Sequence, residues 1–275
     1  MSVAMKLIII GQLGLARCIY LRNSTTMSAA PVDYGHPAWL QSCKAIYLDV
    51  GSNIGVQVRK VFEAHKYPGA AVLPLFDKQF GPAATRAQPS AISGICALGF
   101  EPNPKHLPRL QQLEAAYVQR GWNVHFYPFA AWKSEGVLKF KVVEDPEHND
   151  WGAHVQHFVQ LASEYVVDAR TIDLSAFVQT LPASSVHLMK MDIEGSEYGT
   201  LAAMIGKKEL CNNVIREAFI EVHPWGDASD WGGVRSYDAI AQKINGQVDC
   251  PSGVTVVSNL MDEDYVKDVD SDFAR

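Results

Sequence analysis

The chain has 275 residues, enough to bury a sizeable core in one large domain or two small ones. A hydrophobic fraction of 48% with 20% charged residues is typical of a globular protein and not of a disordered one. The net charge of −6 leaves no broad basic surface, so we expect no nucleic-acid partner.

Residues 1–32 contain three basic residues, a Ser/Thr cluster and no acidic residue. This composition is typical of an organelle transit peptide or an imperfect signal sequence, although a disordered leader would look similar. The apolar runs are too short and too charged for a stable membrane span. We therefore expect a leader over 1–40 and a single domain over 41–275. We favour a cytoplasmic location, with an organelle or the secretory pathway as alternatives.

The cysteines are scattered, odd in number and without a Cys-x-x-Cys pair. They are Cys18, Cys43, Cys96, Cys211 and Cys250. We expect reduced thiols and neither a disulfide framework nor a zinc site.

Short apolar segments rich in β-forming residues alternate with helical segments along the chain. The strands are expected at 45–50, 96–100, 123–126, 186–191, 218–222 and 254–257, with hairpin arms at 137–143 and 165–168. The helices are expected at 54–65, 104–120, 171–179, 196–205 and 234–244, with caps at Asn103 and near Thr171. This alternation predicts an α/β fold with a doubly wound, mostly parallel sheet.

The segment 67–94 interrupts this pattern with four prolines and several Gly and Ala residues. Strand signals resume directly after it, so we expect a long insertion or lid within the domain and not a linker.

The first strand is followed by the sequence DVGSNIG, from Asp49 to Gly55. Glycines at such a turn let the backbone approach a ligand, and the next helix offers free N–H groups. The spacing is not the G-x-G-x-x-G of NAD-dependent oxidoreductases, and no Walker-type lysine is present. A carboxylate that can accept two hydrogen bonds from a ribose diol instead follows the second strand, at Glu101.

Six sequence blocks in order give a more specific indication. They are YLDVGSNIG, GFEPNP, AAW at 130–132, TIDL at 171–174, LMKMDIEGSE at 188–197 and IEVHP at 220–224. Together they resemble the FkbM-type branch of the class I S-adenosylmethionine-dependent methyltransferases, over residues 45 to about 260. The resemblance implies a Rossmann-like, seven-stranded fold with S-adenosylmethionine as the cofactor.

The resemblance also implies cofactor-binding residues. Asp49, Gly51, Asn53 and Gly55 would form the loop at the methionine part, and Glu101 would hold the ribose. Asn103 would lie near the adenine edge, with Ala130 and Ala131 packed beside the ring and Asp192 contributing at the end of the fourth strand.

Catalytic candidates lie at the ends of two strands that can be neighbours in such a sheet. Methyl transfer to a hydroxyl needs help with the departing proton, so Asp192 or His223 is expected to act as the general base. Lys190 shares the strand face of Asp192 and is expected to pair with an acid. Glu194 and Glu197 have the alternative role of stabilising a helix N-terminus.

We assign no metal site, although Asp192, Glu221 and His223 include types of side chain that bind hard metal ions. Two further loops could recognise the acceptor. The first runs from His148 to His154, and the second contains Trp225, Asp227, Asp230 and Trp231.

The favoured function is O-methylation of a small-molecule, sugar or lipid-like acceptor. The alternatives are N-methylation of a peptide or protein and cofactor binding without turnover, since a fold does not fix its function. Oligomeric state and acceptor identity do not follow from the sequence.

Overall fold

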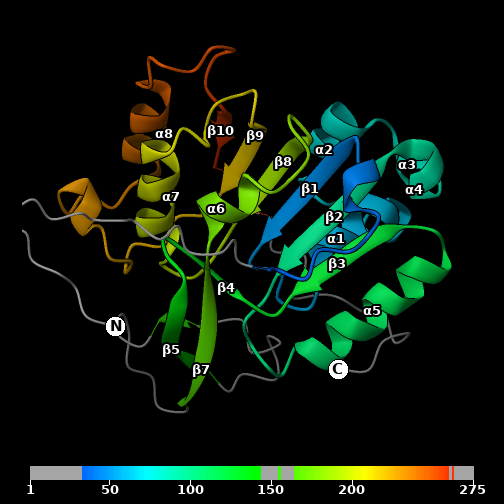
Figure 1. Cartoon of the computed structure of the whole chain (residues 1–275), viewed down its shortest axis with the longest axis horizontal. Coiled ribbons are helices and arrows are strands. Elements are labelled where there is room, and N and C mark those ends of the chain that lie inside the picture. The colour runs from blue at the N-terminus through cyan, green and yellow to red at the C-terminus, as the bar shows by residue number, and fades with distance from the viewer. Residues whose placement is uncertain (1–32, 144–153, 156–163, 260–261, 263–275) are drawn as a thin grey trace, which may run out of the picture. The chain divides into compact units, whose positions relative to one another are not determined.

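The computed structural model describes residues 33–143, 154–155, 164–259 and 262. By its internal contacts the chain divides into Met1–Tyr34 and Gly35–Arg275. All the elements below belong to the second unit (Figure 1). No helix within the described ranges is both long and apolar enough to cross a membrane.

The main sheet has six strands, all parallel, in the order β10-β9-β8-β1-β2-β3. They are β1 (Ala45–Val50), β2 (Ile95–Phe100), β3 (Asn123–Tyr127), β8 (Val186–Met191), β9 (Ile215–Ile220) and β10 (Val256–Ser258). The predicted mostly parallel α/β fold is confirmed, but the expected count of seven strands is wrong for the described residues. The two predicted hairpin arms pair with each other instead of adding a strand to this sheet.

These arms belong to a second sheet, in the order β4-β7-β5-β6. Its strands are β4 (Ala130–Trp132), β5 (Gly136–Val143), β6 (His154–Val155) and β7 (Glu164–Asp173), and β5 and β7 lie at the bottom of Figure 1. Because β7 continues to Asp173, the helix predicted from Thr171 begins later, as α6 (Leu174–Val178). The carboxylate of Asp173 caps it by accepting from the N–H of Ala176.

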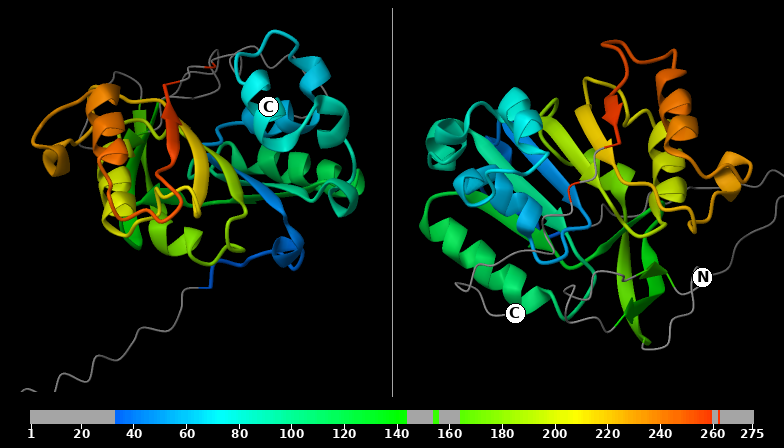
Figure 2. Two further views of the ribbon diagram at one scale, coloured as in Figure 1. Left: turned by 90° about the horizontal axis from the view of Figure 1, so that it is seen from above. Right: turned by 180° about the vertical axis from the view of Figure 1, so that it is seen from behind.

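Within the described residues, each of the strands β1, β2, β8 and β9 is followed by a helix that leads to the next parallel strand. These helices are α1 (Val56–Phe62), α5 (Leu107–Gln119), α7 (Glu197–Gly206) and α8 (Tyr237–Asn245). The strand order reverses beside β1. Because the crossovers are right-handed, the helices on the two sides of this point cover opposite faces of the sheet. Figure 2 shows α1 and α5 on one side of the domain and α7 and α8 on the other. The cap predicted at Asn103 is wrong, because α5 begins after His106.

The segment 67–94 forms three short helices, α2 (Leu73–Phe80), α3 (Ala83–Arg86) and α4 (Ser90–Ser93). Phe76 and Phe80 of α2 are buried and pack edge-on against the Tyr47 ring of β1, with centroids 5.1 and 6.4 Å away. Full burial of such a side chain contributes roughly 1.5–3 kcal/mol to stability. The insertion therefore completes the main hydrophobic core on this side of the sheet.

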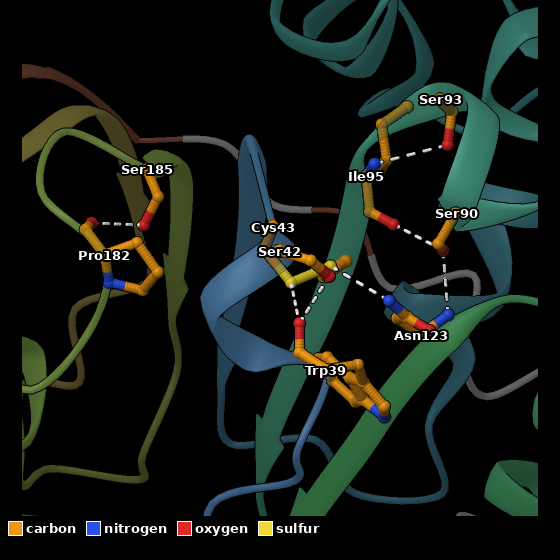
Figure 3. Close-up of a disulfide and its surroundings, with 10 residues drawn as sticks. Trp39, Ser42, Cys43, Ser90, Ser93, Ile95, Asn123, Pro182 and Ser185 are labelled. Atoms are coloured by element: carbon orange, nitrogen blue, oxygen red, sulfur yellow. Dashed lines mark hydrogen bonds between the residues drawn. A yellow bond between two sulfur atoms is a disulfide. The ribbon is translucent and has the colours of Figure 1, made fainter.

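Two disulfides join four of the five cysteines, so the expectation of reduced thiols is wrong. Cys43 bonds to Cys96 and Cys211 bonds to Cys250. Pairing of β1 with β2 brings the first two cysteines together, with Cα atoms 5.9 Å apart (Figure 3). Cys18, the fifth, lies outside the described residues.

Candidate active site

A partly open cavity lies at the carboxyl ends of β1, β2 and β8. The strand order reverses between β1 and β8, which is where doubly wound sheets bind ligands. The predicted residues that line it are Gly51, Asn53, Glu101, Ala130, Ala131, Lys190 and Asp192. Among the described residues, none from the insertion at 67–94 lines this cavity.

The turn after β1 depends on glycine at two positions. Gly51 has a φ of 92°, and a Cβ atom there would lie 1.8 Å from the carbonyl oxygen of Asp192. Only glycine therefore allows the ends of β1 and β8 to approach this closely. Gly55 precedes α1 with a φ of 83°, and a Cβ there would lie 2.7 Å from the Leu113 side chain. Gly55 holds the turn and does not line the cavity.

Glu101 connects the turns that follow β1 and β2. Its carboxylate accepts hydrogen bonds from the backbone N–H groups of Asn53 and Asn103, each at 2.7 Å. A carboxylate has about four acceptor positions, and His106 Nδ1 lies 3.5 Å from Oε1, so at least one position remains for a hydroxyl donor in the cavity. Asn103 is buried, and its amide oxygen accepts from the N–H of Lys105, so it holds the turn instead of facing the cavity.

The apolar wall of the cavity comes from the second sheet and the segment before it. Ala130 and Ala131 of β4 are buried, and Phe129 and Phe140 line the cavity beside them. The two phenylalanines were missed by the sequence reasoning. Phe140 lies outside the six blocks, in β5, which is held in place by its pairing with β7.

Asp49 is fully buried behind the cavity and does not line it. The Tyr47 hydroxyl donates to its Oδ1 at 3.4 Å, whereas Oδ2 forms no hydrogen bond to a described residue. Burial raises the pKa of the Asp49 carboxyl to about 6, although the charge of Lys190 opposes this shift. Because Asp49 does not line the cavity, it could act on a ligand there only through its charge.

Lys190 joins the ends of β1 and β8. Its ammonium donates to the carbonyl oxygen of Gly51 at 2.6 Å and lies 3.0 Å from Asp192 Oδ2 and 4.0 Å from Asp49 Oδ1. Burial lowers the pKa of Lys190, but the two carboxylates outweigh this effect and raise it overall. Lys190 is therefore a fixed cation that orients Asp192.

His223 follows β9 and lies among carboxylates. Its Nδ1 is 2.9 Å from Glu197 Oε1, which also accepts from the N–H groups of Ile193 and Gly195. Its Nε2 lies 3.6 to 3.9 Å from oxygens of Glu194, Asp192 and Glu221. Asp192 and Glu194 line the cavity, whereas His223 lies behind them.

Burial and neighbouring charges shift the pKa values of His223 and Glu194. Burial lowers the pKa of His223, but the hydrogen bond and charge of Glu197 and the other carboxylates raise it to about 9. Burial raises the pKa of Glu194 to about 8, with His223 opposing the shift and Asp192 adding to it.

The loop after β9 combines one anchor with one exposed aromatic ring. The indole N–H of Trp231 donates to the carbonyl oxygen of Tyr198, and its side chain is buried. Asp227 accepts from the N–H of Ser229, and Asp230 pairs with Lys133. Trp225 is 42% exposed and contacts the His223 ring, so it is the member of this loop that a ligand could reach. The other predicted loop runs from His148 to His154, and its residues 148–153 lie outside the described residues.

Comparison with known proteins identifies a family for most of the chain. A model of the methyltransferase FkbM domain matches residues 49–247. A crystal structure of a methyltransferase FkbM from Methylobacillus flagellatus KT is similar at 16% identity with a TM-score of 0.31. The similarity covers 61% of this chain and 31% of that one, so the chain spans about a third of that protein. No curated protein matches the chain.

Proposed function

The chain belongs to the FkbM methyltransferase family, and from this premise we propose that it uses S-adenosylmethionine to methylate a hydroxyl of a small-molecule, sugar or lipid-like acceptor. The observation that supports the proposal most is the place of Glu101. This carboxylate joins two strand-end turns and lines the cavity at the carboxyl ends of β1, β2 and β8, where doubly wound sheets bind ligands.

The residues around the cavity fit the parts of this cofactor. Glu101 would hold the ribose hydroxyls, and Ala130 and Ala131 would face the adenine ring. Asn53 and Gly51 would flank the methionine part, and the charge of Asp49, buried behind them, would attract its ammonium group. Bound there, S-adenosylmethionine supplies a methyl group on a sulfonium, with the leaving group already in place.

In this proposal the protein positions the acceptor, excludes water and removes one proton. Asp192 is the proposed base, because its carboxylate lines the cavity whereas His223 lies behind it. Lys190 holds one oxygen of Asp192 and leaves the other toward His223. With the methyl group supplied by the bound cofactor, Asp192 would accept the proton that the acceptor hydroxyl gives up.

Isothermal titration with S-adenosylmethionine tests the cofactor site. We expect saturable binding by the wild type and a loss of about 1.5–3 kcal/mol in Glu101→Ala, which is roughly a 10- to 150-fold weaker Kd. Glu114→Ala is the matched control, because Glu114 also accepts from a backbone N–H, that of Phe126, but lies outside the cavity. Failure of folded wild-type protein to bind would refute the proposal.

The acceptor class needs a second experiment, in which hydroxyl and amine compounds are offered together with methyl-labelled cofactor. An O-methyltransferase would label hydroxyl compounds, and Asp192→Asn would lower that turnover by about 10²- to 10⁴-fold. Labelling of amines or peptides alone would favour N-methylation, which needs less help from a base. Cofactor binding with no labelled product in either class would favour a protein that binds without turnover.

A further inference from the structure

Three side chains from the ends of β8 and β9 direct potential metal ligands toward one point. One such atom each from Asp192, Glu194 and His223 lies within 4.8 Å of the other two. His223 Nε2 is 3.6 Å from Glu194 Oε2 and 3.8 Å from Asp192 Oδ1. With metal–ligand bonds of about 2.0–2.3 Å, ligands of one ion lie roughly 3.0–4.6 Å apart. The spacing observed is close to that of a coordination sphere.

The orientation of His223 is an independent observation that points to a ligand. Its side chain is only 7% exposed, and its Nδ1 is hydrogen-bonded to Glu197. Its Nε2 is directed at the carboxylates and forms no hydrogen bond with a described residue. Histidines that bind metals typically donate their other ring N–H to a carboxylate, which fixes the tautomer. Glu197 is in that position, and two backbone N–H groups hold it there.

The position of the group gives an ion access to the cavity. Asp192 and Glu194 line the cavity, so an ion between them would keep coordination positions open toward it. Glu221 adds a further oxygen 3.9 Å from Nε2. Without an ion, Lys190 and the protonated His223 are the cations beside these carboxylates, so a bound ion would take the place of the proton on Nε2.

We propose that Asp192, Glu194 and His223 bind one divalent cation, for which Mn²⁺ is the suitable probe. Two carboxylates favour hard ions such as Mg²⁺ and Mn²⁺, and of these two Mn²⁺ has the higher general affinity for sites with nitrogen ligands, whereas the imidazole also suits Fe²⁺ and Zn²⁺. In this set of ligands Glu194 replaces Glu221, which the sequence indicates beside Asp192 and His223. An acceptor hydroxyl bound to the ion would have a lowered pKa, and with Asp192 engaged as a ligand it would give its proton to water instead of to Asp192. This catalytic role rests on the proposed methyltransferase function, whereas the ion site itself does not.

The test is a titration of chelator-treated, full-length protein with Mn²⁺, in which free Mn²⁺ is followed by electron paramagnetic resonance. We expect one bound ion per chain and at least about tenfold weaker binding in Glu194→Gln. Glu194 is a suitable position, because its side chain makes no hydrogen bond to a described residue and is 18% exposed. Asp230→Asn removes a carboxylate outside the cluster and should bind Mn²⁺ as the wild type does.

The possible results separate this proposal from the proposed function. The ion site is refuted if folded wild type leaves Mn²⁺ free up to about 1 mM, or if Glu194→Gln binds as tightly as the wild type. S-adenosylmethionine is titrated in parallel without metal. Cofactor binding without Mn²⁺ binding overturns only the ion site, and Mn²⁺ binding without cofactor binding overturns only the methyltransferase proposal. His223→Asn, checked by its melting curve, should reproduce the effect of Glu194→Gln.

Discussion

The Lys190 ammonium lies 3.0 Å from Asp192 Oδ2, and both side chains are largely buried at the end of β8. The same ammonium donates to the carbonyl oxygen of Gly51 and lies 4.0 Å from Asp49, so one cation serves two strand ends. Removing it would leave two carboxylates close together without their shared counter-ion.

We therefore expect Lys190→Met to lower the free energy of unfolding by about 3–5 kcal/mol, the usual cost of breaking a buried ion pair from one side. Urea unfolding at neutral pH measures it. Lys139→Met is the matched control, because Lys139 pairs with Asp168 at a similar distance but both side chains are more than half exposed. In Lys139→Met the free energy of unfolding should fall by less than about 1 kcal/mol. Equal losses in the two variants would contradict the role given to Lys190.

A second prediction concerns Glu63, which joins the end of α1 to the end of α5. Burial raises the pKa of Glu63, but hydrogen bonds from Tyr117, Arg120 and Lys66 and the charge of Arg59 outweigh it and lower the pKa to about 2. A carboxylate with a depressed folded-state pKa stabilises the protein above its unfolded pKa of about 4.5. This contribution disappears as the pH falls from about 4.5 through about 2.

Glu63→Gln should accordingly be less stable than the wild type at pH 7 by on the order of 2 kcal/mol. The difference should shrink steadily between pH 4.5 and pH 2. Chemical denaturation of both proteins across this range provides the measurement. A difference that stays constant down to pH 2 would show that the ionised carboxylate contributes nothing.

A third prediction concerns Gly226, in the loop after β9. A Cβ atom there would lie 2.4 Å from the carbonyl oxygen of Gly195 and 2.7 Å from the Tyr198 ring. Gly226→Ala should therefore push this loop away from the turn before α7 and cost roughly 1–3 kcal/mol. Gly206→Ala, in α7, has no atom within 4 Å of the new Cβ and should be neutral or slightly stabilising. The melting temperatures of both variants provide the measurement. An undiminished melting temperature in Gly226→Ala would contradict the close approach of Gly226 to Gly195 and Tyr198.

The parts of the fold that the sequence predicted are those with a local pattern. Each strand of the parallel sheet is a short apolar segment ended by a turn, and every predicted strand is found within a few residues of its expected place. The turn at Gly51 and the carboxylate at Glu101 follow from the same reasoning, because both lie at strand ends that must meet at one edge of a parallel sheet.

The parts that the sequence did not predict depend on contacts between distant segments. The register of β1 and β2 brings Cys43 and Cys96 together, and neither spacing nor count indicates that pairing. Phe140 lines the cavity from β5, which is held in place by its pairing with β7. Glu194 was interpreted as a helix-stabilising acid, but the turn after β8 directs it toward His223 instead.

The disulfides lead to the final prediction. Chain-entropy estimates for loops closed by Cys43–Cys96 and Cys211–Cys250, with separations of 53 and 39 residues, give about 4 kcal/mol each as an upper value. Measured values are commonly about 2–4 kcal/mol, so we expect a loss of that size when either bridge is removed. The single variants Cys43→Ser and Cys96→Ser and their double variant form the test. Because either single change already removes the bond, the double variant should be about as unstable as each single one. Additive losses in the double variant, or wild-type protein whose stability is unaffected by a reductant, would show that these two thiols are not bonded to each other.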